Sequence, residues 1–364
     1  MTGDEDFAAW FRLLETPGLG REGARRLLAA CGTPAAVLST PAATLHALVG
    51  PKLADALQRT PTEFLPRLDA ARQWLQGGPG RHVLTLDHPA WPPLLLQTAD
   101  PPLLLYAQGD LACLSAPAVA IVGSRHPSPQ GADNARCFAA SLASAGWLVV
   151  SGMAQGIDAA AHEGALAAGA KTVAVVGTGL DITYPPRHRA LAQRIAEQGV
   201  LVSEYAPGTP PLPEHFPQRN RIIAGLTQGT LVVEAALRSG SLITARLANE
   251  AGREVWAVPG SIHNAQSRGC HALIKQGAKL VETAQDILDE LLAPAAPRQA
   301  ELPLDGPLAD PLLQALGEDP VTLDALLART GESTAALTAR LLELELDGHV
   351  ARLPGGLYQR RHAA

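Results

Sequence analysis

From residue 81 to residue 258 the sequence alternates short, continuous apolar runs with segments of helical pattern. Apolar runs of this kind are typical of strands that are buried on both faces of a sheet. Strict alternation of strands and helices indicates an α/β fold, with a Rossmann-like, doubly wound parallel sheet and right-handed crossovers. The predicted strands are 82–86, 103–108, 119–123, 147–151, 172–177, 200–204, 230–234 and 254–258, with helices near 130–145, 158–169, 187–198, 218–225, 241–252 and 268–277.

The first part of the chain reads as short helices. Residues 7–14 and 22–30 have helical patterns and are separated by Thr16-Pro17-Gly18-Leu19-Gly20. This spacing is typical of a helix-hairpin-helix or SAM-like domain, in which glycines let the backbone approach a phosphate. A plain helical bundle with a glycine turn fits the same pattern.

The last part of the chain predicts a winged helix. A stretch rich in Pro and Ala predicts a linker. Helices over 308–316, 322–329 and 333–346 then precede a hairpin over 348–358. The third helix carries Glu343, Glu345 and Asp347 against one arginine, Arg340, which favours a protein-contact or regulatory role over DNA reading. The predicted domains are 1–78 (helical), 79–292 (sheet), 293–306 (linker) and 307–364 (winged helix).

Polar and glycine-containing motifs follow the central strands. Carboxyl ends of parallel strands meet at one edge of the sheet, where ligands of such folds bind. The sequence therefore predicts a single site there. Its motifs are Gly123-Ser124-Arg125, Ser151-Gly152, Gly177-Thr178-Gly179, Arg219-Asn220-Arg221 and the segment 234–241.

One of these motifs indicates the ligand. In Phe216-Pro217-Gln218-Arg219-Asn220-Arg221 an aromatic residue precedes two arginines, and Pro217 predicts that they lie at a loop-to-helix junction. Bases stack on aromatic rings and phosphates bind guanidinium groups, so the pattern predicts single-stranded nucleic acid. The predicted DNA-binding residues are Gly123, Ser124, Arg125, Gly177, Gly179, Arg187, Arg189, Phe216, Arg219, Asn220, Arg221, Ser239, Gly240 and Ser241.

Taken in order, these motifs resemble the DNA-processing protein A (DprA/Smf) family, densely over about residues 80–290. The resemblance implies a homodimeric, non-catalytic recombination mediator. Such a protein protects incoming single-stranded DNA and loads the RecA recombinase onto it during natural transformation. For the dimer interface we predict Ile262, Leu273 and Ile274, which lie near a terminal helix with uncovered apolar residues.

An enzyme is the alternative. The fingerprint G-x-G-x-x-G is missing after residue 122, and the Walker motif is missing from the whole sequence. Gln228-Gly229-Thr230-Leu231-Val232-Val233-Glu234 resembles the P-G-G-x-G-T-x-x-E motif of LOG-type phosphoribohydrolases, without its leading Pro-Gly-Gly. A nucleotide- or nucleobase-binding enzyme thus remains open, as does a regulator that binds double-stranded DNA through the winged helix.

Single polar residues of the site favour structural roles over catalysis. We expect Asp158 to cap the helix after Gly156, and Glu234 to orient an arginine such as Arg125 or Arg221. The histidines lack metal-ligand spacing. We therefore predict no catalytic residue, no metal and no cofactor.

Composition restricts where DNA can bind. The formal net charge is −6, so a DNA site must be a local patch on an acidic protein. The four cysteines are scattered, as expected in a reducing compartment. The start is acidic and no apolar run reaches the length of a membrane span, so we expect a soluble, cytoplasmic protein without membrane contact.

Overall fold

The computed structural model describes residues 3–292, 311–316, 321–353 and 356–360. The chain divides into two compact units, Met1–Leu292 and Ala293–Ala364. Each unit has its own apolar core. The predicted linker over 293–306 lies outside the described residues.

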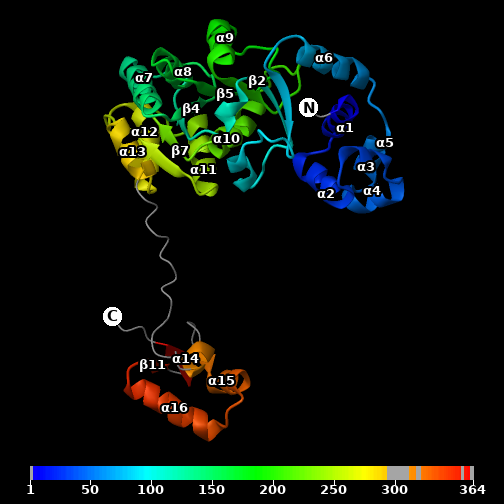
Figure 1. Ribbon diagram of the computed structural model, residues 1–364. Helices are drawn as coiled ribbons and strands as arrows, with labels where there is room; N and C mark the ends of the chain where they lie inside the picture. The colour runs from blue at the N-terminus through cyan, green and yellow to red at the C-terminus, as the bar shows by residue number, and fades with distance from the viewer. Residues whose placement is uncertain (1–2, 293–310, 317–320, 354–355, 361–364) are drawn as a thin grey trace. The chain divides into compact units, whose positions relative to one another are not determined.

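A nine-stranded sheet forms the centre of the first unit (Figure 1). All pairs from β6 to β9 are parallel, as predicted, whereas β1 and β2 pair antiparallel at one edge. A loop with a short 3-10 helix, Pro93–Gln97, joins β1 to β2, and without a crossover helix between them the two strands can run antiparallel. The strands are β1 (Arg81–Thr85), β2 (Leu104–Gly109), β3 (Ala118–Val122), β4 (Leu148–Ser151), β5 (Thr172–Val176), β6 (Val200–Ser203), β7 (Gly229–Val232), β8 (Glu254–Ala257) and β9 (Lys279–Leu280).

The strand order is β1-β2-β6-β5-β4-β3-β7-β8-β9. From β3 the chain builds outwards through β4, β5 and β6. It then returns to the other side of β3 to form β7. The direction of winding therefore reverses between β3 and β7, and a crevice is expected at the carboxyl ends of these two strands.

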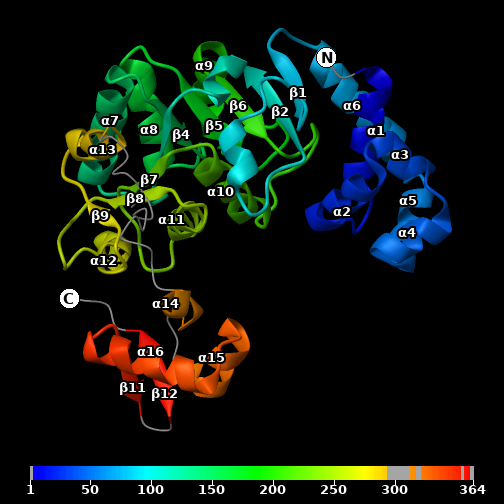
Figure 2. The same ribbon diagram turned by 60° about the horizontal axis from the view of Figure 1, so that its bottom comes forward.

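Helices cover both faces of this sheet (Figures 1 and 2). Every residue of β3 is buried, and alternate residues belong to two different apolar cores. One core contains residues of α10 (His215–Gly225), α11 (Gly240–Glu250) and α12 (Arg268–Lys275). The opposite face carries α7 (Pro129–Ser144), α8 (Ile157–Ala167), α9 (Arg189–Gln198) and α13 (Ala284–Leu292), the last of which the sequence analysis missed.

Six helices precede the sheet: α1 (Asp4–Leu14), α2 (Arg21–Cys31), α3 (Pro34–Ser39), α4 (Ala42–Val49), α5 (Pro51–Gln58) and α6 (Phe64–Gln76). Phe7, Trp10 and Trp74 from α1 and α6 share an apolar core with Leu104 and Tyr106 of β2. This core packs the helical region against the antiparallel edge of the sheet.

The second unit contains the helices and hairpin of a winged helix. They are α14 (Pro311–Leu316), α15 (Leu323–Thr330) and α16 (Thr334–Leu346), with a three-stranded sheet of β10 (Val321–Thr322), β11 (Val350–Leu353) and β12 (Leu357–Arg360). Residue 308, where the first of these helices was predicted to begin, lies outside the described residues. Leu326, Leu337 and Leu341 are fully or almost fully buried between these elements.

Candidate nucleic-acid interface

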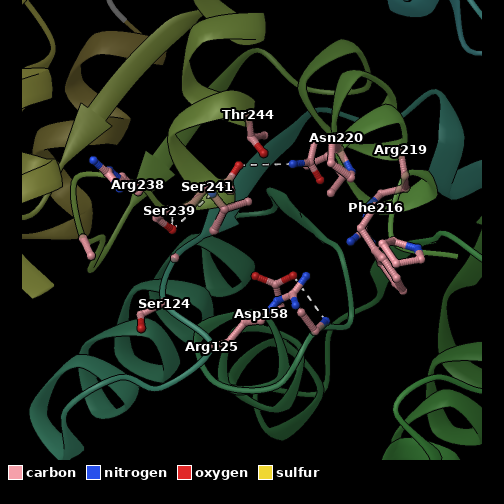
Figure 3. A pocket seen from close by; sticks show the side chains of 18 of the residues that line it. Ser124, Arg125, Asp158, Phe216, Arg219, Asn220, Arg238, Ser239, Ser241 and Thr244 are labelled. Atoms are coloured by element: carbon pink, nitrogen blue, oxygen red, sulfur yellow. Dashed lines mark hydrogen bonds between the residues drawn. The ribbon is translucent and has the colours of Figure 1, made fainter. Parts of the chain in front are cut away.

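A pocket of about 640 Å³ opens at the carboxyl ends of β3 and β7, where the winding of the sheet reverses. Figure 3 shows its walls, which come from the loop after β3, from α10 and from the start of α11. The lining residues include Gly123, Ser124, Arg125, Asp158, Tyr184, Phe216, Arg219, Asn220, Arg238, Ser239, Gly240, Ser241 and Thr244. Nine of the predicted site residues therefore meet at one place.

One wall is aromatic and positively charged. The guanidinium of Arg125 lies over the ring of Phe216, 5.7 Å from its centroid. Tyr184 lies on Phe216 with a centroid distance of 5.4 Å, and its side chain is 44% exposed. These three side chains also line an adjoining cavity of about 120 Å³. This wall offers a ring face and a cation to a base and its phosphate.

The facing wall is the start of α11. Ser239 caps this helix, because its hydroxyl accepts a hydrogen bond from the backbone N–H of Ser241 at 3.3 Å. The Asn220 amide donates to the carbonyl of Gly240 at 3.2 Å and so ties α10 to this turn. Arg238 is exposed and lines the same wall. A helix start with an adjacent arginine favours bound anions.

Arg219 lines the pocket, but its guanidinium forms hydrogen bonds within the protein. The side chain is 4% exposed and donates to the carbonyls of Gly152 and Val175, at the ends of β4 and β5. Burial lowers the pKa of Arg219 to about 10, and the nearby Asp158 opposes this shift. The group stays charged at neutral pH. It holds the two strand ends together and contributes positive charge beneath the pocket.

Arg221 points away from the pocket. It is 9% exposed, donates to the backbone carbonyl of Asp100 at 2.7 Å and pairs with the carboxylate of Glu204. The cause is helical geometry: α10 already begins at His215, so residues 219 and 221 lie on different faces of one helix. The predicted loop-to-helix junction at these arginines is therefore wrong, since Pro217 fits within the first turn of the helix.

Two carboxylates differ from expectation. Glu234 pairs with no arginine among the residues that the structure describes. Its oxygens accept hydrogen bonds from the backbone N–H and the hydroxyl of Ser128, at 2.8 and 2.6 Å. Asp158 does not cap α8, because it lies inside that helix and accepts from the N–H groups of Gly152 and Ala154. Burial raises the pKa of Asp158, against the opposing charge of Arg219.

The other predicted residues do not line the main pocket. Gly177 is buried beneath Phe216, where an added Cβ would lie 3.3 Å from the ring. Gly179 is packed against the backbone of Ala206. Arg187 and Arg189 are exposed, and Arg187 binds Gln155, which lines the smaller cavity. Gly177 and Arg187 therefore contact residues that line the two cavities, whereas Gly179 and Arg189 line neither cavity.

Sequence reasoning did not single out Tyr184, Arg238 or Thr244 as site residues, although Arg238 lies within the motif segment 234–241. Arg238 directly precedes the motif Ser239-Gly240-Ser241, so its position next to a helix start was the available signal. Nothing local identifies Tyr184, since only the tertiary fold brings it to Phe216. Within the described ranges there is no group of three potential metal ligands. The same ranges hold no helix that is long and apolar enough to cross a membrane.

Comparison with known proteins follows the same division of the chain. The family model of DNA recombination-mediator protein A matches residues 82–292, and that of the DprA winged helix domain matches residues 293–356. Protein Smf of Escherichia coli is 43% identical over 309 residues, which cover 81% of this chain and 82% of that protein. DNA processing protein DprA of Streptococcus pneumoniae is 51% identical over 196 residues, which cover 54% of this chain and 69% of that protein.

Two solved structures share the fold. DNA processing protein A of Streptococcus pneumoniae matches with a TM-score of 0.68 and 38% identity, covering 78% of this chain and 97% of that one. The Helicobacter pylori protein matches with a TM-score of 0.53 and 32% identity, covering 58% of this chain and 96% of that one. The latter structure describes a single-stranded DNA binding mode of that protein.

Proposed function

This chain belongs to the DNA recombination-mediator protein A (DprA/Smf) family, and we propose that it binds single-stranded DNA in the pocket between β3, β7 and α10. The observation that carries this proposal is the pairing of Arg125 with Phe216 at an open pocket. Within the described ranges, Arg125 and Arg238 line the pocket and have no carboxylate within ion-pair distance. Their charge is therefore available to phosphate groups.

Family membership supports a finer assignment. We propose that the protein protects incoming single-stranded DNA in the cytoplasm and loads the RecA recombinase onto it during natural transformation. It does so by binding alone, without catalysis or cofactor. The Glu234 carboxylate is already occupied by Ser128, which gives no support to an enzyme of the LOG type.

We further propose a homodimer that forms through α12 and the loop before it. Ile262 is 71% exposed, and Leu273 and Ile274 are half-buried against the core of the sheet. Apolar side chains that remain exposed or half-buried are typical of a surface that a partner covers. A second copy of the chain is the occupant that we propose.

The DNA site is tested by fluorescence anisotropy with labelled oligo-dT and with a duplex, each over a range of salt concentration. Arg125→Ala removes one phosphate contact, so affinity falls and the log–log salt slope flattens by about 0.7. Phe216→Ala removes a stacking surface worth about 1–3 kcal/mol and leaves the slope unchanged.

Arg194→Ala is the matched control, because Arg194 is an exposed arginine of α9 outside the pocket. Wild-type affinity and slope in both site variants would contradict the proposed site. Preference for the duplex would favour a regulator of double-stranded DNA. Turnover of free nucleotides by the wild-type protein would favour the enzyme reading.

A further inference from the structure

A cluster of five charged residues joins the helical region to the helix that carries Phe216. This junction cluster consists of Arg21 and Arg25 of α2, Asp100 of the loop before β2, Glu204 at the end of β6, and Arg221 of α10. It lies on the side of α10 that faces away from the pocket. None of the functional roles assigned above explains it.

Asp100 is the centre of the cluster. Arg21 Nε donates to Asp100 Oδ2 at 2.8 Å, and Arg25 Nη2 donates to Asp100 Oδ1 at 2.5 Å. Arg25 Nη1 also reaches the backbone carbonyl of Pro101 at 2.9 Å. Burial alone would raise the pKa of Asp100, but hydrogen bonds from the arginines and their charges lower it overall. Asp100 is therefore ionised at neutral pH and holds both arginines of α2.

The other half of the cluster holds α10. The Arg221 side chain is 10% exposed and its partner Glu204 is 13% exposed. Arg221 also lies 3.3 Å from the Asp100 carboxylate, so α2 and α10 share one acidic partner. Removing one member of a buried pair leaves an uncompensated charge, which is strongly destabilising. The cluster thus fixes α10 relative to α2.

A second set of contacts extends along the same helix towards the pocket. Tyr205 donates from its hydroxyl to the Gln218 amide oxygen at 3.2 Å and stacks on His215, with a centroid distance of 3.9 Å. His215 and Gln218 flank Phe216 in the first turn of α10. The position of this turn decides where the Phe216 ring meets Arg125.

We propose that α2 of the helical region positions α10, and with it Phe216, through the junction cluster, so that Arg21 and Arg25 are positioning residues and not DNA ligands. This inference rests on the proposed DNA function of the pocket. The positioning role stands in place of the phosphate contact that a helix-hairpin-helix in this region would make.

The substitution Asp100→Asn distinguishes a positioning role from direct DNA contact, because the two roles predict opposite changes in affinity for oligo-dT. If Arg21 and Arg25 touched DNA, loss of an acidic neighbour would strengthen binding. If they position α10, the loss weakens binding of oligo-dT, by about fivefold for roughly 1 kcal/mol of lost preorganisation.

Asp133→Asn is the matched control, because this substitution removes the same charge. Asp133 is an exposed acid of α7 that pairs only with Arg136 among the described residues. Affinity in Asp100→Asn that equals or exceeds that of Asp133→Asn would overturn the proposal. A flattened salt slope in Arg25→Gln would do so too, because that is the mark of a lost phosphate contact.

Hydrogen exchange of the DNA-free protein tests the positioning itself. In Arg25→Gln and in Asp100→Asn we expect faster amide exchange at residues 222–225 of α10, with unchanged exchange in α7. The double variant should resemble Asp100→Asn, because that substitution already removes the carboxylate partner of Arg25. Unchanged exchange in α10 would overturn the proposal. Failure of wild-type protein to bind oligo-dT would instead contradict the proposed function, and hydrogen exchange would still decide whether α2 positions α10.

Discussion

At the scale of single residues, the same amino acid has different roles within one short motif. Arg219 and Arg221 are two positions apart, yet the first binds strand-end carbonyls and the second binds Glu204. Arg125, from a distant loop, is the arginine that lies over Phe216. A guanidinium is suited to all of these partners, so residue type by itself does not tell a ligand from a structural group.

His162 shows how burial can dominate the pKa of a titratable group. It is fully buried, and its Nδ1 lies 2.8 Å from the Thr172 hydroxyl. Its Nε2 has no hydrogen-bond partner in the part of the chain that the structure describes. Burial lowers the pKa of His162 to about 3, with smaller contributions from the charges of Arg219 and His188.

We expect this histidine to make the fold sensitive to mild acid. Between pH 6.5 and 3 the unfolded chain binds a proton that the native state does not. The free energy of unfolding is therefore unaffected by the titration of His162 above pH 6.5. Below that pH it decreases by about 1.4 kcal/mol per pH unit. His162→Gln removes this titration, so its free energy of unfolding should lose about 2 kcal/mol less than wild type between pH 7 and pH 5. Urea unfolding at both pH values measures the difference, and equal losses in the two proteins would contradict it.

At the scale of elements, the loop between β3 and α7 is held by the strand beside it. Ser124 donates its backbone N–H to the carbonyl of Glu234 at 2.7 Å, and the Glu234 side chain binds Ser128, which caps α7. Gly131 leaves room for this carboxylate, because an added Cβ would lie 2.4 Å from it. The loop that presents Arg125 is therefore fixed at both ends.

Breaking this link should loosen the loop. In Glu234→Ala the backbone N–H of Ser128 loses its partner, which costs about 1–3 kcal/mol and weakens binding of oligo-dT. Glu234→Gln keeps an acceptor for that N–H and should lie between wild type and the alanine variant. Thermal unfolding and anisotropy measure the two effects. If both variants had the thermal stability and the oligo-dT affinity of wild type, the loop would not depend on Glu234.

At the scale of the whole molecule, the two units differ in what they offer to DNA. The first contains the pocket with Arg125 and Arg238. Between residues 305 and 364 the sequence has nine acidic residues against five arginines. Long-range attraction to phosphates supplies most non-specific affinity, and the second unit cannot provide it. The division of the chain into domains at residues 78, 292 and 306 stays a prediction.

We therefore expect a chain that ends at Leu292 to bind oligo-dT within about twofold of the full-length affinity, since the phosphate contacts are retained. It should also keep the dimeric mass, because Ile262 and α12 lie in the retained unit. Anisotropy and light scattering at micromolar concentration test both points. A folded, dimeric truncation without oligo-dT binding would place the DNA site elsewhere. A monomeric mass for the full-length protein would contradict the proposed dimer.

The architecture of the first unit, and the edge at which its motifs meet, could be predicted from the sequence alone. The β-branched runs located eight of the strands, because burial on both faces leaves a continuous apolar signal. It missed β9, which has two residues, and the antiparallel pairing of β1 with β2, because strand direction depends on the connection and not on apolar pattern. The sequence motifs predicted nine of the residues that line the pocket, because the carboxyl ends of parallel strands meet at one edge of the sheet.

Which polar groups face the pocket depends on the tertiary fold and could not be predicted from the sequence. Arg221 forms ion pairs with Asp100 and Glu204, and the Glu234 carboxylate accepts hydrogen bonds from Ser128. In each case the partners are far apart in the chain. Tyr184 reaches Phe216 in the same way. A charged or polar side chain can satisfy its hydrogen bonds with solvent, ligand or protein, and the choice depends on what the fold brings within about 3 Å of it. The periodicity of apolar residues along the sequence predicts which side chains are buried, but it does not predict which partners the polar side chains bind.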